Sequence, residues 1–107
     1  MKGRVEAARR FAQEARRTYP SEVEKVILFG SVARGMDGED SDIDVLVVWR
    51  GAHNKGLRAM TGLAFHLLLE TEEYVSVKVL TTEEFEHGRR GGSPFVEAVL
   101  AEGRALA

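Results

Sequence analysis

Two aspartates on a predicted strand are the side chains of this sequence best suited to chemistry. A Gly-Ser pair stands at 30–31, and after a polar segment the sequence continues Ser-Asp-Ile-Asp-Val-Leu-Val-Val over 41–48. Because side chains at i and i+2 of a strand point to the same side, Asp42 and Asp44 share a face while Ile43 enters the core. Two carboxylates opposite a Gly-Ser turn with exposed N–H groups suit a divalent metal ion that carries nucleotide phosphates.

The other residues of this segment have candidate roles in binding phosphate. Gly30 lacks a Cβ and lets the backbone approach phosphates, and Ser31 can donate its N–H and O–H to β- or γ-phosphate oxygens. Arg34 suits a bidentate phosphate contact, or alternatively an ion pair with an acid within 37–40. Ser41 is expected to brace the loop before the two aspartates rather than to react.

The elements that must position these residues are those of a small α/β domain. Apolar residues recur with helical spacing in some segments and form short continuous or alternating runs in others, which predicts helices and strands respectively. The run 43–49 is nearly all apolar and is therefore expected in the centre of the sheet. The predicted helices are 4–18, 57–71 and one from Pro94, and the predicted strands are 24–29, 43–49 and 74–80.

Three shorter features complete this prediction. Composition indicates a loop at 50–56 and makes 88–93 the most flexible-looking segment, and Thr82 is expected to cap a short helix start over 82–86. Trp49 ends the central strand and is interpreted as core packing, with a stacking platform for a base as the alternative.

Composition limits the classes of protein to which the chain can belong. At 107 residues a single domain over 1–107 is expected, and 44% hydrophobic and 30% charged residues are typical of a soluble globular protein. A net charge of −2 argues against broad, charge-driven binding of nucleic acid. The absence of cysteine excludes disulfides and Cys-based zinc sites. Without a membrane-length apolar run or a signal-like leader, a cytoplasmic protein is expected.

The pattern Gly-Ser-x-x-Arg-Gly-x5-Ser-Asp-x-Asp over 30–44 resembles the signature of the polymerase-β-like nucleotidyltransferases. Within that superfamily the chain is similar to the minimal nucleotidyltransferases, which are single small domains. The resemblance implies a mixed three- to four-stranded sheet with helices mainly on one face. It also implies Mg²⁺ (or Mn²⁺) held by Asp42 and Asp44, and transfer of a nucleoside monophosphate, first of all AMP from ATP, to a hydroxyl.

The resemblance further implies a partner. Minimal nucleotidyltransferases are commonly paired with a small helical protein of the HEPN type, in some cases as the antitoxin of a toxin–antitoxin pair that modifies the toxin. A homo-oligomer is the alternative source of acceptor specificity.

The chain departs from the family pattern at a later strand, from which these enzymes usually draw a third carboxylate. Aligning that strand places Lys78 where the third acid would stand. Ser76 and Lys78 share a face, so Lys78 can point toward Asp42 and Asp44, bind phosphate, or disfavour a second cation. Three alternatives stay open: a weak one-metal transferase, an enzyme completed by a carboxylate of 70–73 (Glu70, Glu72 or Glu73) or of a partner, and a degenerate domain kept for binding.

Overall fold

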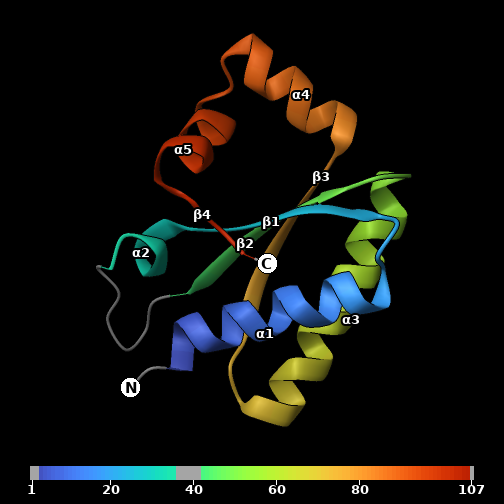
Figure 1. The fold of residues 1–107 in the computed structure, drawn as a ribbon, viewed down its shortest axis with the longest axis vertical. Coiled ribbons are helices and arrows are strands. Elements are labelled where there is room, and N and C mark those ends of the chain that lie inside the picture. The colour runs from blue at the N-terminus through green and yellow to red at the C-terminus, as the bar shows by residue number, and fades with distance from the viewer. Residues whose placement is uncertain (1–2, 36–41, 107) are drawn as a thin grey trace.

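The computed structural model describes residues 3–35 and 42–106. The elements that it describes are, in chain order, α1 (Gly3–Thr18), β1 (Val23–Phe29), α2 (Gly30–Ala33), β2 (Ile43–Trp49), α3 (His53–Thr71), β3 (Val75–Thr81), α4 (Thr82–Gly91), α5 (Pro94–Glu102) and β4 (Arg104–Ala105). These strands form one mixed sheet in the order β3-β2-β1-β4 (Figure 1). In it β2 pairs antiparallel with β1 and parallel with β3.

Helices lie on both sides of the sheet. The long helices α1 and α3 cover one face, while the shorter helices α4 and α5 lie against the other (Figure 1). The expected mixed sheet of three to four strands is confirmed, and its two longest helices share a face as expected. The additional finding is that the second face is covered as well, and this is the face toward which Asp44 points.

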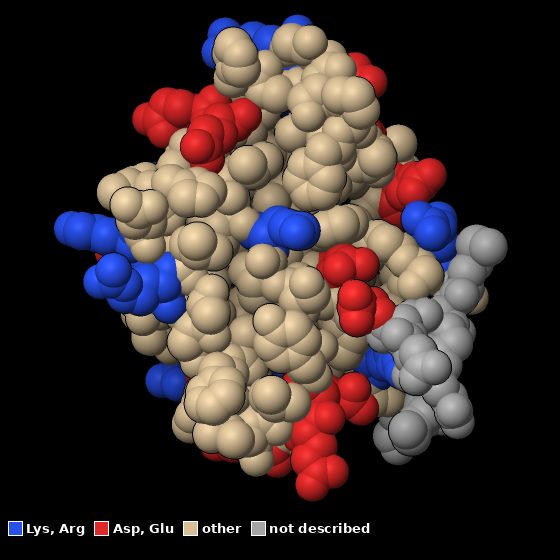
Figure 2. Space-filling model, turned by 180° about the vertical axis from the view of Figure 1, so that it is seen from behind, with Lys and Arg blue, Asp and Glu red and all other residues tan. Residues whose placement is uncertain are grey.

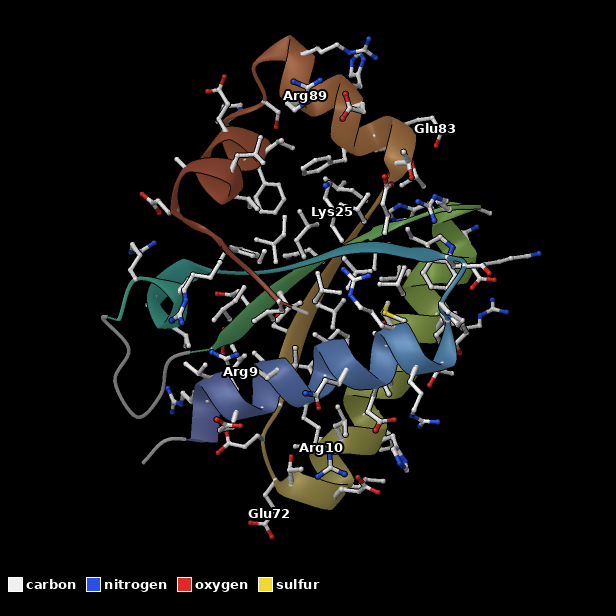
Figure 3. The ribbon with its side chains drawn as sticks, viewed as in Figure 1. Arg9, Arg10, Lys25, Glu72, Glu83 and Arg89 are labelled. Atoms are coloured by element: carbon white, nitrogen blue, oxygen red, sulfur yellow. The ribbon has the colours of Figure 1, made fainter. Side chains whose placement is uncertain are left out.

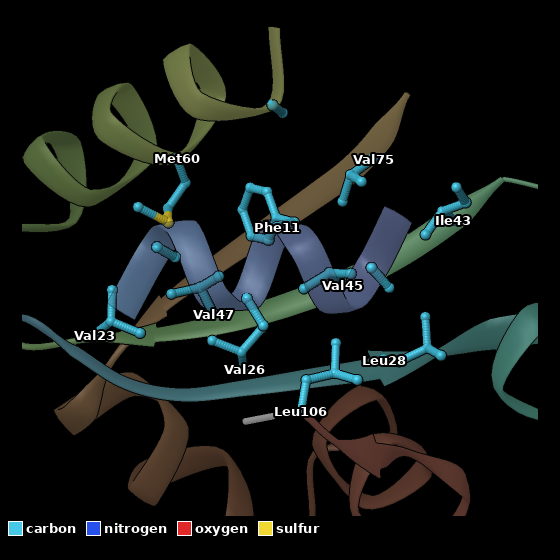
Figure 4. Close-up of a cluster of buried hydrophobic side chains, with 14 of the residues drawn as sticks. Phe11, Val23, Val26, Leu28, Ile43, Val45, Val47, Met60, Val75 and Leu106 are labelled. Atoms are coloured by element: carbon cyan, nitrogen blue, oxygen red, sulfur yellow. The ribbon is translucent and has the colours of Figure 1, made fainter. Parts of the chain in front are cut away.

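The larger core lies between the sheet and the two long helices. Helix α1 turns a stripe of apolar residues at helical spacing toward the sheet, and Phe11 of this stripe is fully buried beside Met60 of α3 (Figure 4). Strand β2 supplies Val45 and Val47 to this core and Leu46 to the smaller core under α4 and α5. Burial on both faces explains why β2 is nearly all apolar, and the prediction that it is central is confirmed.

The segment 50–56 was expected to be a loop, but α3 already begins at His53. Gly56 lies inside this helix, where a Cβ would stand only 2.6 Å from the Trp49 ring. The glycine therefore permits a close helix–strand contact and does not mark a loop. Trp49 is buried and its ring packs edge-on against Tyr19 at 5.4 Å, so the core-packing interpretation holds and the stacking platform is wrong.

The C-terminal helices differ from expectation at their boundaries. Thr81, not Thr82, is the N-cap of α4, and its side chain and that of Glu84 form a reciprocal capping box. Helix α4 continues to Gly91, so most of the segment 88–93, which is the most flexible-looking in the sequence, is helical. The two-residue strand β4 was not predicted, because a two-residue strand has no periodicity. Nowhere in 3–35 or 42–106 does a helix combine the length and apolar character that crossing a bilayer requires.

Candidate active site

The strand pairing brings the Gly-Ser turn and the two aspartates together. Asp42 immediately precedes β2 and is exposed, and Asp44 is the second residue of the strand and is partly buried. Phe29, the last residue of β1, is the register partner of Asp44. The chain therefore turns at Gly30 directly beside the Asp44 side chain, as the motif predicted.

Two properties of Gly30 make room for the Asp44 side chain. Its φ of 78° lies in the left-handed region, which disfavours residues with a Cβ. A Cβ at this position would also stand 2.5 Å from Oδ2 of Asp44. The bare turn thus lets the carboxylate lie against the backbone, and any larger residue would push it away. Val32 anchors the turn by burying its side chain, while Ser31 beside it stays partly exposed.

Arg34, one of the candidate phosphate-binding residues, is paired with an acid from a distant part of the chain. Arg34 makes an exposed ion pair through Nη1 with Oε1 of Glu102 on α5, at 3.2 Å. Exposed pairs of this kind contribute little, so the guanidinium is available to exchange this partner for a phosphate. The alternative partners within 37–40, and Ser41, lie outside the described residues.

The electrostatics of the site centre on Asp44. Its partial burial raises the pKa of its carboxyl above the usual range, and the negative charge of Asp42 raises that pKa further. The positive charge of Lys78 opposes this shift, so Lys78 acts on the same site. In the β2–β3 register Ser76 is the partner of Asp44, and Lys78 is the partner of Leu46. Lys78 is therefore on the side of the aspartates, two residues further along; its replacement of a third acid stays a prediction.

The donor set fits a metal ion that takes two protein carboxylates. Among the residues that the structure describes, no group of three or more Asp, Glu or His side chains could hold a metal. Glu70, one of the acids considered as a third ligand, instead pairs with Arg10 at 2.5 Å and with His66 at 3.3 Å. Mg²⁺ commonly binds one or two carboxylates and fills its other positions with phosphate and water oxygens. A cation between Asp42 and Asp44 would also relieve their repulsion.

One feature beside the site was not predicted. A groove of about 460 Å³ runs along β3, with Lys78, Phe95 and His53 among its lining residues. Phe95 is edge-on to Phe29 at 5.4 Å, and Nδ1 of His53 lies 3.0 Å from Oε1 of Glu84. These residues come from separate elements and share no motif, so the sequence offered no signal for the groove.

Comparison with known proteins identifies the protein family. Residues 8–105 match the family model described as nucleotidyltransferase domain, and the chain belongs to that family. Among individual proteins, it is 30% identical over 106 residues to "Putative protein adenylyltransferase MJ0604" of Methanocaldococcus jannaschii, and the match covers 94% of each chain. The resemblance drawn from 30–44 is thereby confirmed.

Solved structures confirm the fold. A crystal structure of a toxin–antitoxin with AMP-PNP matches with a TM-score of 0.61 and 21% identity, over 92% of this chain and 72% of that one. A mutant of the toxin–antitoxin MntA-HpeT matches with a TM-score of 0.55 and 22% identity, over 90% and 68% respectively. At such identities the matches establish the shared architecture.

Proposed function

We propose that this nucleotidyltransferase domain transfers AMP from ATP to a hydroxyl of a partner protein, with Mg²⁺ or Mn²⁺ bound by Asp42 and Asp44. The observation that carries the proposal is the placement of the Asp44 carboxylate against the bare Gly30 turn, with Asp42 two residues earlier and its charge acting on the same carboxyl. Two carboxylates close to a tight turn that offers N–H donors suit a metal-bound triphosphate. The name of the 30% identical relative supports AMP as the transferred group and protein as the acceptor.

The chemistry assigns each group a task. The acceptor oxygen forms a bond to the α-phosphorus of ATP, the bond from that phosphorus to the bridging oxygen breaks, and pyrophosphate leaves. The bound cation would neutralise phosphate charge. In this proposal Ser31 would donate hydrogen bonds to the triphosphate, and Arg34 would do so after leaving Glu102. The proton of the acceptor hydroxyl goes to a base, and Asp42 and Asp44 are the candidate carboxylates for that role.

The names of the fold neighbours also support the proposal of a protein acceptor. Two of them are toxin–antitoxin structures, and one of these contains AMP-PNP. We propose that the acceptor is a small helical protein of the HEPN type, and that modifying it is how this chain would act as an antitoxin.

Lys78 favours a second candidate function. Lys78 places an ammonium on the side of the aspartates, and no three Asp, Glu or His side chains of the described residues are grouped to hold a metal, which suits a domain that binds a partner and transfers nucleotide weakly or not at all. In this alternative the chain is a binding or antitoxin module with a degenerate site.

The two candidates are separated by measuring binding and transfer in the same preparation. Wild type, Asp42→Asn/Asp44→Asn and the control Glu83→Gln/Glu97→Gln, which removes two exposed carboxylates elsewhere, are titrated with Mg²⁺–ATP by calorimetry. Each is then incubated with α-labelled ATP, Mg²⁺ and a helical partner protein, and label on the partner is counted.

We expect wild type and control to bind Mg²⁺–ATP and label the partner, and the double aspartate variant to bind at least 10-fold more weakly, as typical losses of metal-site residues suggest. Binding of the partner by wild type without labelling would favour the binding module. Equal Mg²⁺–ATP affinity in all three proteins would show that the site is assigned to the wrong residues.

A further inference from the structure

Strand β3 is an outer strand of the described sheet and has β2 on one side only. The N–H of Thr81, at the end of β3, donates to Oε1 of Glu84 at 2.8 Å, so this group points away from β2. Backbone groups alternate in direction along a strand, and those of Val77 and Val79 therefore point away from β2 as well. Among the described residues, neither valine has a backbone hydrogen bond outside the sheet. The outer edge of β3 thus offers backbone donors and acceptors to another molecule.

The groove of about 460 Å³ beside the candidate active site lies along this edge. Val77 and Val79 line it together with Leu57 of α3 and Phe95 of α5. Leu57 is 42% exposed and Phe95 is 37% exposed. Because α3 and α5 cover opposite faces of the sheet, the edge has an apolar wall on each side. A strand carries side chains alternately on its two sides, so a strand in this groove would contact both walls.

The surface around the edge carries little charge. In Figure 1 β3 passes behind β1 and β2, so the view from behind in Figure 2 faces the outer edge of the sheet. The middle of that view is largely uncharged, and most charged side chains lie toward its margins (Figure 2). Lys78, which is exposed on β3, supplies a positive charge to the groove.

Acidic residues stand at the two ends of the strand. The exposed Glu72 lies three residues before β3, and the exposed Glu83 lies two residues after it. Figure 3 shows both side chains at opposite ends of β3, projecting away from the molecule. The edge therefore presents negative charge at each end and the positive charge of Lys78 between them.

We propose that an extended segment of a partner protein binds here by adding a strand to β3. The outward backbone groups of Val77 and Val79 decide the class of occupant, because a second extended backbone offers matching donors and acceptors, whereas a helix uses its own internally. The complementary segment has alternating apolar side chains, an acid near Lys78 and basic residues toward its ends. This inference rests on the proposed function only in taking the segment from a partner protein.

A second copy of β3 does not fit this pattern. In either direction its acidic ends would meet Glu72 and Glu83, and like charges placed opposite each other destabilise a strand pair. The charges of the edge therefore favour a different protein.

A synthetic peptide with the complementary pattern is the probe. Acetyl-Lys-Val-Thr-Val-Glu-Val-Thr-Val-Lys-amide reads the same in both directions, so it tests parallel and antiparallel addition alike. Its control is the charge-reversed peptide, with glutamate at both ends and lysine in the centre. In calorimetry with the full chain, we expect the probe to bind about tenfold more tightly than the control, because three exposed charge contacts change sign.

Methylated peptide nitrogens test whether the backbone makes the contact. With the valines of the probe on the side of Leu57, the valine amides face β3 in an antiparallel pair and the threonine amides face it in a parallel pair. We expect methylation of the two inner valine amides, or of the two threonine amides, to lower affinity at least about tenfold, and methylation of the other set to have little effect.

Hydrogen exchange of the full chain locates the contact. We expect saturating probe to slow exchange of the Val77 and Val79 amides at least about tenfold, by a hydrogen bond to each. The amides of Lys78 and Leu80, which point toward β2, should change little.

A variant of the groove wall separates this inference from the proposed function. Leu57→Lys should weaken probe binding several-fold and keep the wild-type affinity for Mg²⁺–ATP. Leu69→Lys, at another exposed leucine of α3 that does not line the groove, should leave probe binding unchanged.

Several results would overturn the inference while leaving the nucleotide measurements as they stand. They are absence of probe binding, equal effects of the two sets of methyl groups, and probe binding that leaves exchange at Val77 and Val79 unchanged. Slower exchange at these valines with Mg²⁺–ATP in place of the probe would assign the groove to the nucleotide and overturn it equally.

Discussion

Replacing Gly30 by alanine should separate the role of the turn in folding from its role in the site. Alanine at a φ of 78° loses about 1–2 kcal/mol of folding free energy, the usual difference between left-handed and right-handed backbone. The new Cβ would stand 2.5 Å from Oδ2 of Asp44, whereas an ordinary contact between carbon and oxygen is about 3.3 Å or longer. The carboxylate must therefore move by about 1 Å.

A displacement of about 1 Å in an active site commonly lowers activity on the order of 10²-fold, and disturbance around a metal lowers metal affinity roughly 10- to 100-fold. We thus expect Gly30→Ala to be folded, to lose about 1–2 kcal/mol in urea denaturation, and to bind Mg²⁺–ATP at least about 10-fold more weakly in calorimetry.

Gly35→Ala is the matched control for this experiment. Gly35 also has a positive φ, of 71°, but a Cβ there meets no described atom within 4 Å. It should lose a similar free energy of unfolding and keep its affinity for Mg²⁺–ATP. If the two variants bind Mg²⁺–ATP equally well, the contact of Gly30 with Asp44 does not position a ligand, and the reasoning about the turn fails.

Three further predictions concern single side chains. Lys78→Asp should add a Mn²⁺ site and raise nucleotide transfer, and Lys78→Ala should change metal affinity more than the rate of transfer. If neither substitution changes metal titration or turnover, Lys78 does not act on this site. Since the pKa of Asp44 is raised mainly by burial, the folded state binds the Asp44 proton more tightly than the unfolded state. The free energy of unfolding therefore falls as the pH rises from the ordinary pKa of an aspartate, in the unfolded chain, to the raised pKa of the folded state. Asp44→Asn should therefore be more stable than wild type at pH 7 in urea denaturation, with a difference that shrinks in acid. Thr81→Ala removes the N-cap of α4 and should lower the free energy of unfolding by about 1 kcal/mol, measured in the same way.

Much of the fold could be predicted because the apolar patterns are strong. Strand β2 is nearly all apolar as a consequence of having a layer on each face, and α1 has a clear stripe of helical spacing. The sequence-based predictions were wrong where a glycine is required by close packing and not by a turn. Gly56 was interpreted as a loop residue and Gly88 as part of a flexible-looking segment, yet a Cβ at either would stand within 2.7 Å of a packed side chain, of Trp49 and Val96 respectively. Composition cannot distinguish a glycine that bends the chain from one that admits a neighbour.

The site could be predicted where its residues are close in sequence. The motif of 30–44 fixed both the Gly30 turn and the shared face of Asp42 and Asp44, because a strand has a period of two. Contacts between distant segments were not accessible. Glu102 as partner of Arg34, 68 residues away, depends on how α5 returns to the turn.

The position of β3 at the edge of the sheet has a consequence for how this protein can evolve. Asp44 is on the central strand, against Gly30, where few residues other than the native ones fit. Lys78 is exposed on the outermost strand, where an exchange of side chain usually changes stability by no more than about 0.5 kcal/mol. Mutation can therefore sample position 78 freely while the fold and the aspartate pair are inherited unchanged. Descendants of one such chain could differ in catalytic output through that single site, without passing through an unfolded ancestor.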